Sequence, residues 1–259
     1  MMYAAVCIAA LMAAALTFVS GFGLGTLLLP AFALFVPAEL AVAATAVVHL
    51  ANNVLKLVMT GGRADRRVVL RFGLPALGAS IVGALAQREL EGLHPVAVYT
   101  LIGHACEITW VKGAVGAVIV GFAVLELSPR YEGMAFDARY LPVGGVLSGF
   151  FGGLSGHQGA LRAGFLARCG LTKEAFVASG VVCSVMVDVS RLSVYGAGTV
   201  GRLRSAHDLV GPIVAGCVAA FVGTLIGSRV VSKMTLRGVR RVVGVALLLF
   251  GVAMAAGAV

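Results

Sequence analysis

The residues of this chain that are best suited to chemistry lie in a glycine-rich stretch, Ser148 to Gly170, within very apolar sequence. It reads SGFFGGLSGHQGALRAGFLARCG and combines seven glycines with His157, Gln158 and Arg162. An ionisable group in membrane-like sequence marks a functional site by default. Non-helical backbone survives at membrane depth only where protein or a water-filled cavity surrounds it. The stretch therefore predicts a binding site at a break between two helices.

The residue types of this stretch could bind a small anion. The N-terminus of a short helix offers free N–H groups and a favourable dipole to an anion, and arginine binds oxyanions through two parallel hydrogen bonds. Arg162 follows the glycines by about one helical turn, so we expect it to reach back to the break. The candidate binding residues of the stretch are Gly153, Ser155, Gly156, His157, Gln158 and Arg162.

A structural explanation stays open beside each of these roles. Arg162 could lie at a helix end and contact lipid phosphate. His157 could hydrogen-bond across the break, or relay the proton that drives transport. Ser155 and Gln158 could serve only to satisfy the backbone of a broken helix. We expect the glycines at 152, 153, 156 and 159 to allow close approach and left-handed backbone.

Two long apolar segments carry a second set of polar residues. Asp188 and Arg191 are spaced i, i+3, so they can form an ion pair on one helix face, and a buried charge requires such a partner. The structural reading is therefore favoured, with proton or Na⁺ uptake by Asp188 as the alternative. The residues of the set outside this pair are His49, Asn52 and Lys56, of which His49 and Asn52 are candidates for lining the anion site.

Composition identifies a polytopic membrane protein. The 259 residues are 60% hydrophobic and 12% charged, whereas a soluble domain has about 25% charged residues. The net charge of +9 comes from basic residues in short loops, which is typical of topology determinants and lipid contacts. No nucleic-acid recognition module is present in the sequence, so we expect a lipid bilayer and a small anion as partners and leave a homodimer open.

Sequence motifs give no support to an enzyme. The chain lacks HExxH, GxSxG and P-loop patterns. The five cysteines form no CxxC pair and no zinc-type spacing. We therefore expect no catalytic residue, no metal and no cofactor, with H⁺ or Na⁺ as coupling ion left open.

Apolar runs define ten segments, since a full crossing needs about 20 residues. Two of them, 140–154 and 155–168, are too short for separate crossings and predict a re-entrant hairpin that turns at Gly152–Gly159. The first two segments could form a longer hairpin of the same kind. The others span 39–59, 68–86, 96–125, 173–195, 209–230 and 241–258, after 2–19 and 20–36 at the start.

The two halves of the chain repeat. Asn53 and Lys56 match Asp188 and Arg191, each pair three residues apart. Two further matches flank this one: Ser20-Gly21-Phe22 with Ser148-Gly149-Phe150, and Leu74-Pro75-Ala76 with Gly211-Pro212-Ile213. The repeat adds Ser20 and Gly23 to the candidate binding residues. We predict a first repeat at 1–127, a second at 140–259 and a connecting loop at 128–139.

Loop charges predict that the repeats are inverted, because hairpin-plus-three-crossing halves then gather most Lys and Arg on one side. The first 55 residues contain no Lys or Arg, so both termini are expected on the non-cytoplasmic side of a cell membrane. The predicted fold is an all-α polytopic membrane protein in which each repeat has a broken or re-entrant helix pair plus three transmembrane helices. Two such interrupted segments are the usual pointer to a transporter's binding site.

The chain resembles the TauE/SafE sulfite exporter family, also called the toluene sulfonate uptake permease family. The resemblance rests on SGFGLGTLLLP near the start, SGFFGGLSGHQGALR in the middle and the following GLTKEAFVASGVVCSVMVDVSRLSVY. It implies secondary transport of small sulfur-containing or organic anions such as sulfite or sulfonates. A passive anion channel is the alternative. His157, Gln158 and Arg162 stand where the family usually has glycines and a proline, which points to a separate branch.

Overall fold

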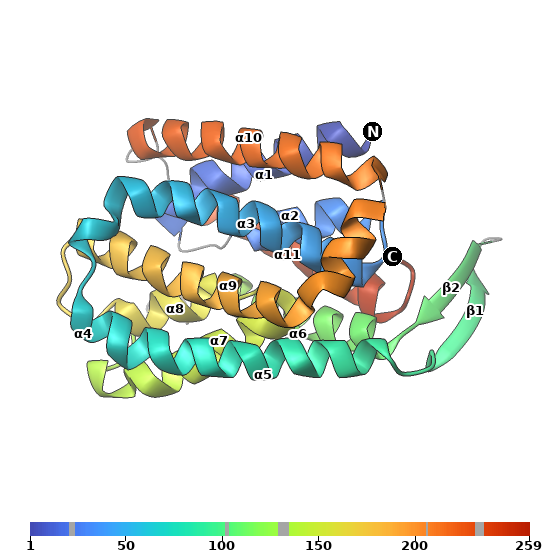
Figure 1. Ribbon diagram of the computed structural model, residues 1–259, viewed down its shortest axis with the longest axis horizontal. Helices are drawn as coiled ribbons and strands as arrows, with labels where there is room; N and C mark the ends of the chain where they lie inside the picture. Colours follow the sequence, from blue (N-terminus) through green and yellow to red (C-terminus); the bar gives the residue numbers. More distant parts are fainter. Residues whose placement is uncertain (21–23, 102–103, 129–134, 206, 231–235) are drawn as a thin grey trace.

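The fold is a bundle of long helices with a projecting β-ribbon, described by a computed structural model (Figure 1). The structure describes residues 1–20, 24–101, 104–128, 135–205, 207–230 and 236–259. The first half contains α1 (Met2–Ser20), α2 (Gly25–Ala33), α3 (Ala38–Thr60), α4 (Arg66–Val68), a π-helical turn (Val69–Gly73), α5 (Leu74–Glu91), β1 (Ala97–Leu101), β2 (His104–Ile108) and α6 (Trp110–Leu127). The second contains α7 (Leu141–Ser155), α8 (Gly159–Leu166), α9 (Lys173–Ser205, kinked at Gly196), α10 (His207–Val230) and α11 (Leu236–Ala255).

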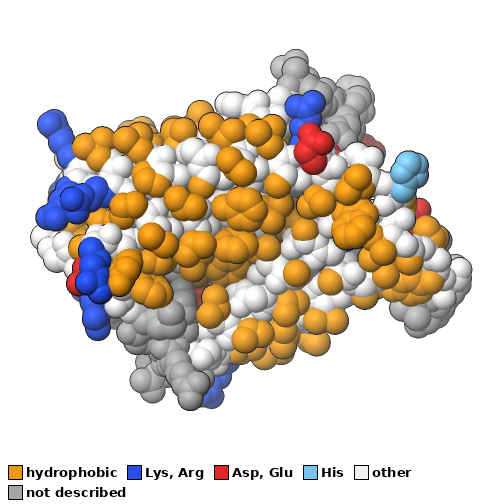
Figure 2. Space-filling model, turned by 90° about the horizontal axis from the view of Figure 1, so that it is seen from below, with side chains coloured by type: hydrophobic (Ala, Val, Ile, Leu, Met, Phe, Trp, Pro, Cys, Tyr) orange, Lys and Arg blue, Asp and Glu red, His pale blue; other side chains and the backbone are white. Residues whose placement is uncertain are grey.

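Five described helical segments are long and apolar enough to cross a membrane. They are Ala38–Arg63, Arg66–Glu91, Trp110–Leu127, Lys173–Gly196 and Asp208–Arg229. Hydrophobic side chains cover the middle of the molecule, and Lys and Arg side chains gather at one end of it (Figure 2). Such an apolar belt with a basic end is typical of a protein that spans a bilayer.

Helices from the two halves pack against each other in pairs. Alongside α3 and α9 in the centre, α1 packs on α10, α5 on α7 and α6 on α11 (Figure 1). The pairs α1/α10 and α5/α7 run parallel. Leu11 and Ala15 face Gly223 and Gly227 in the same order, and Ala76 and Ser80 of α5 face Gly149 and Gly153 of α7 in the same order. Each half therefore relies on the other for its packing surface.

Glycines bring α7 unusually close to α5. A Cβ atom at Gly149 or Gly153 would collide with a backbone carbonyl oxygen of α5, and one at Gly145 with a carbonyl oxygen of the π-helical turn before it. The three glycines are four residues apart and so share one helix face. Small residues at such spacing let helix backbones approach in membranes, where packing replaces the hydrophobic driving force.

The helix break expected in the middle of the chain is present, and it is a hairpin. The helix α7 ends at Ser155, Gly156 adopts left-handed backbone (φ 82°), and α8 begins at Gly159. The chain then turns back, because the amide of Phe136 before α7 donates to the carbonyl of Gly164 near the end of α8 (3.2 Å). The turn is thus narrower than the predicted range of 152–159. Of the four glycines expected to adopt left-handed backbone only Gly156 does, whereas Gly152, Gly153 and Gly159 are helical.

Two details of the sequence prediction can be refined. The segment at 96–125, which is too long for one straight helix, consists of the antiparallel β1–β2 ribbon followed by α6, since Val98, Tyr99 and Thr100 favour a strand. The match of Ser20 with Ser148 is wrong, because Ser20 ends α1 whereas Ser148 lies within α7. The residue that ends α7 is Ser155, 135 positions after Ser20, and the same offset separates the starts of α3 and α9.

Replacing Gly149 by Ala should destabilise the protein by about 1–3 kcal/mol, the usual cost of overpacking, because its Cβ would collide with the backbone of Ala76. The matched control is Gly78→Ala on α5, where nothing lies within 4 Å of the added atom. Thermal unfolding of both variants in detergent checks this. A Gly149→Ala variant as stable as the control would contradict the close α5–α7 packing.

Candidate functional site

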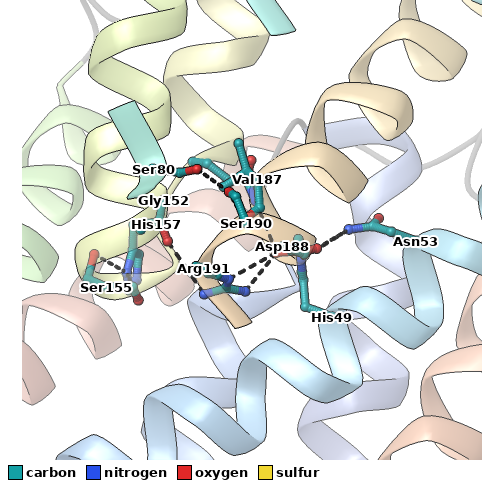
Figure 3. A network of polar contacts seen from close by, with 12 residues as sticks. His49, Asn53, Ser80, Gly152, Ser155, His157, Val187, Asp188, Ser190 and Arg191 are labelled. Carbon is teal, nitrogen blue, oxygen red and sulfur yellow. Dashed lines mark hydrogen bonds and ion pairs between the residues drawn. The ribbon is translucent and has the colours of Figure 1, made fainter. Parts of the chain in front are cut away.

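The centre of the bundle holds a carboxylate surrounded by hydrogen-bond donors. Asp188 on α9 is fully buried. Its Oδ1 accepts from Arg191 Nη2 (2.8 Å) and Nε (3.1 Å), and its Oδ2 lies 2.6 Å from His49 Nδ1 (Figure 3). The i, i+3 ion pair expected between Asp188 and Arg191 is therefore present. It is part of a larger network that joins α9 to α3.

The α3 side of this network consists of His49 and Asn53. Asn53 Nδ2 donates to Asp188 Oδ2 (3.0 Å) and also lies 3.0 Å from His49 Nδ1. A carboxylate only accepts, so His49 Nδ1 donates to Asp188 and the Asn53 amide hydrogen bonds to the same oxygen. The residues Asn53 and Asp188, which match in the sequence, thus contact each other directly.

The hairpin turn lies against this network. Arg191 Nη1 donates to the Gly152 carbonyl (3.5 Å), and a Cβ at Gly156 would lie 2.7 Å from the same nitrogen. Gln158, the residue before α8, donates from Nε2 to Asp188 Oδ1 (3.4 Å). The absence of a side chain at Gly156 therefore lets the Arg191 guanidinium reach the tip of the hairpin.

Arg162 joins the network through Gln158. Its Nη1 donates to Gln158 Oε1 (3.2 Å), so α8 presents the guanidinium toward the turn, as its spacing predicted. The side chain is half-buried between α8 and α9, where a Cβ at Gly180 would lie 3.4 Å from Nε. A hydrogen bond to a neutral amide leaves most of the five donors of the guanidinium available for a planar or tetrahedral anion.

Lys56 and Asn52 lie on the same helix as His49 but differ in surroundings. Lys56 is 3% exposed and lies within electrostatic range of Arg162. Asn52 Oδ1 accepts from Thr224 Oγ1 on α10 (2.7 Å), so its carbonyl faces α10 while His49 faces α9. The structure therefore places the two residues that were expected to line one site against different helices.

The remaining candidates of the hairpin form short local contacts. His157 Nδ1 lies 3.2 Å from the Ser155 carbonyl oxygen and 3.3 Å from its Oγ. Ser155 Oγ itself donates to the Phe151 carbonyl (3.0 Å). Gly153 packs on α5. Gly23 and the side chain of Ser20, the candidates of the first hairpin, lie outside the part of the chain that the structure describes.

The helix α2 nevertheless meets the turn between α7 and α8. A Cβ added at Gly25, the first residue of α2, would lie 3.3 Å from the carbonyl oxygen of Gly156. The N-terminus of α2 therefore abuts the turn that leads into α8. Two short helices thus begin close to one another, beside the Arg191 guanidinium of α9.

Several polar residues that support the hairpin had not been singled out in the sequence. Tyr195 Oη on α9 donates to the Gly153 carbonyl (2.8 Å) and contacts Gln87 Oε1 on α5 (2.6 Å). Ser190 Oγ hydrogen-bonds with Ser80 Oγ in the same interface. A glutamine in an apolar helix, such as Gln87, was the only available signal, and it does not reveal its partner.

Charged side chains of both signs gather at this centre. Among the described residues, Lys56, Arg191 and Asp188 are buried there, and Arg162 and Glu126 are half-buried. No group of three or more His, Cys, Asp or Glu in the described part of the chain could hold a metal ion.

Comparison with known proteins gives one result. A family model described as "Sulfite exporter TauE/SafE" matches residues 6–254. No curated protein and no solved structure matches the chain significantly.

Replacing Asp188 by Asn should destabilise the protein by about 3–5 kcal/mol, because it leaves the Arg191 guanidinium buried without its counter-charge. The double variant Asp188→Asn/Arg191→Gln should recover part of this loss. The control is Ser193→Ala, an exposed position on the same helix. Unfolding measurements on the four proteins check the order. An equal loss of stability in the single and double variants would show that the unpaired Arg191 charge does not cause the destabilisation.

Proposed function

The chain belongs to the TauE/SafE sulfite exporter family, which makes it a multi-pass membrane transporter, and from this premise we propose that it carries small sulfur-containing or organic anions such as sulfite or sulfonates. Members of this family are transporters rather than enzymes. The proposed anion site lies between the tips of the two hairpins, next to Gly25, Gly156 and Arg162.

The observation that carries this proposal is the Arg162 guanidinium at the hairpin tip, which hydrogen-bonds with the neutral Gln158 amide, whereas Arg191 is paired with Asp188. Asp188 is the fully buried carboxylate of this network, and Glu126 is half-buried on the other side of the tip. Removing a charge from water is costly unless a counter-charge compensates it. An anion held beside Gln158 and Arg162 would supply that counter-charge, so the empty and loaded states of the carrier would differ in stability.

The two short helices support the same location. Both α2 and α8 begin next to the Gly25–Gly156 contact, where the free N–H groups of a helix N-terminus favour an anion. Discontinuous helices that point their N-termini at an anionic substrate are a recurring design of secondary transporters. Arg162 adds bidentate hydrogen bonding, which suits two oxygen atoms on the same sulfur of a sulfite or sulfonate group.

We further propose that residues 1–127 and 140–259 are inverted repeats joined by 128–139. Their helix pairs support this proposal, since α1 packs on α10 as α7 packs on α5, and the 135-residue offset recurs at two helix boundaries. The contact of Asn53 with Asp188, which match at the same offset, fits a two-fold axis between α3 and α9. Inverted repeats would allow one hairpin to open to each side of the membrane in turn.

Charge distribution supports a location in the cell membrane with both termini outside. Arg63 lies between α3 and α4, Arg66 begins α4, and Lys173 begins α9. Lys and Arg side chains gather at one end of the molecule (Figure 2). Lys and Arg favour the cytoplasmic side. In Figure 1 the two chain ends lie toward the opposite end.

A passive anion channel would use the same broken helices and basic lining. The direct contact of α2 with the hairpin turn favours a carrier. Packed backbone closes the path at this contact, whereas a channel would need a continuous pore. Saturable uptake that follows an ion gradient would support the carrier, and linear flux that ignores the gradient would support the channel.

Arg162→Ala should abolish anion uptake into proteoliposomes while the protein remains folded, because the variant loses the guanidinium at the hairpin tip. Arg162→Lys should also fail, since an ammonium group cannot form two parallel hydrogen bonds. Arg168→Ala, an exposed arginine on the same segment, is the control. The assay uses sulfite, methanesulfonate, sulfate and acetate. Unchanged uptake kinetics in Arg162→Ala would remove this residue from the site.

Single cysteines at the two ends of one long helical segment test the orientation. In a variant without the five native cysteines, a membrane-impermeant maleimide on intact cells should label His94→Cys and not Arg66→Cys. These exposed positions flank the segment that contains α4 and α5. Labelling of Arg66→Cys alone would reverse the proposed orientation.

A further inference from the structure

A small cavity lies on the side of the hairpin tip that faces α2 and α6. It is lined by Thr26, Glu126, His157 and the first turn of α8, with Phe122 and Leu247 completing the wall. Its volume is about 10 Å³, close to the smallest that can hold one water molecule. The cavity brings together a carboxyl group, a hydroxyl group and an imidazole, and the carboxyl and hydroxyl groups were not among the residues expected to bind the anion.

His157 presents a free basic nitrogen to this cavity. Its Nδ1 lies 3.2 Å from the Ser155 carbonyl oxygen. A backbone carbonyl can only accept, so Nδ1 carries the hydrogen and Nε2 is the unprotonated nitrogen. His157 is 5% exposed, and Nε2 is buried without a hydrogen-bond partner among the residues that the structure describes. A buried nitrogen with a free lone pair is costly unless something donates to it.

The ring is also held in place. Phe122 stacks on the imidazole with ring centroids 5.9 Å apart and an interplanar angle of 19°. The same Phe122 packs edge-on against Phe151 of α7. The orientation of Nε2 is therefore fixed by α6 and α7 together, and Glu126 follows Phe122 by one turn on the same helix.

We propose that Glu126 and His157 form a proton-binding pair across this cavity, and that this pair couples proton binding to anion binding. The proposal rests on the proposed function, since it identifies the coupling ion of the same transporter. A carboxylate and a free imidazole nitrogen together bind one proton, which either group can hold. The small volume and the single carboxylate suit a proton better than Na⁺, which requires several oxygen ligands.

The place of the pair explains how it would act on the anion. His157 is adjacent in sequence to Gln158, which hydrogen-bonds with both Arg162 and Asp188. A proton at His157 adds positive charge beside the proposed anion site and so favours anion binding. Thermodynamic linkage requires the reverse as well, so that a bound anion favours proton uptake by the same factor.

The other groups packed around His157 fit this role. From α9, the Arg191 guanidinium lies against Gly156 and interacts electrostatically with the imidazole. Thr26 on α2 contributes a hydroxyl, and Leu247 on α11 is apolar. Arg191 opposes a charge on His157, whereas an anion at the hairpin tip and the Glu126 carboxylate favour it. The proton thus binds most readily when the anion is present.

Isothermal titration calorimetry tests this inference with methanesulfonate or sulfate, whose charges do not change near neutral pH. Titrating the purified protein in two buffers of different ionisation heat gives both anion affinity and the number of protons taken up. The wild type should take up on the order of one proton per anion. Glu126→Gln and His157→Asn should each bind the anion within about tenfold of wild type without that uptake.

The matched control is Glu91→Gln, a half-buried carboxyl group at the C-terminal end of α5 that accepts a hydrogen bond from Gln87. It should keep the proton uptake of the wild type. Anion binding without proton uptake in the wild type, or unchanged uptake in both Glu126→Gln and His157→Asn, would overturn the inference and leave the proposed function standing. Failure of both anions to bind would contradict the proposed function itself, and the coupling with it.

Discussion

The burial of one carboxylate organises the core of this protein. Asp188 is fully buried, and a buried carboxylate is tolerated only when it is paired and hydrogen-bonded. Its donors come from α3, from α9 itself and from the residue before α8, so three elements must meet for the charge to be compensated. Because Arg191 also reaches the Gly152 carbonyl, the same ion pair fixes the hairpin turn against the central helices.

Close backbone packing allows α3, α9 and the hairpin turn to come together around Asp188. The glycine face of α7 lets the first arm of the hairpin lie directly on α5, and Tyr195 of α9 then reaches the Gly153 carbonyl. The missing side chain at Gly156 leaves room for the Arg191 guanidinium at the tip. The glycines thus have two roles, one in a turn and the other in helix contact, and only the first needs left-handed backbone.

Features written in local sequence could be predicted, and long-range contacts could not. The i, i+3 spacing of Asp188 and Arg191 predicted their ion pair, and the polar glycine-rich stretch predicted the helix break. The contact of His49 with Asp188 joins residues 139 positions apart, so it depends on how α3 and α9 cross. The positions of Tyr195, Glu126 and Thr26 next to the hairpin could not be predicted for the same reason, because their neighbours there are distant in the sequence. Polar residues within apolar runs show that a partner exists, and topology decides which one.

The central claim is that a small sulfur-containing anion binds at the meeting point of the two hairpins. The most direct measurement is an experimental structure of the protein with selenate, whose selenium can be located by anomalous scattering. The account predicts a selenium peak beside Gly156, within hydrogen-bonding reach of Arg162 or Gln158. A selenium peak only among the exposed arginines at the basic end of the bundle would contradict it.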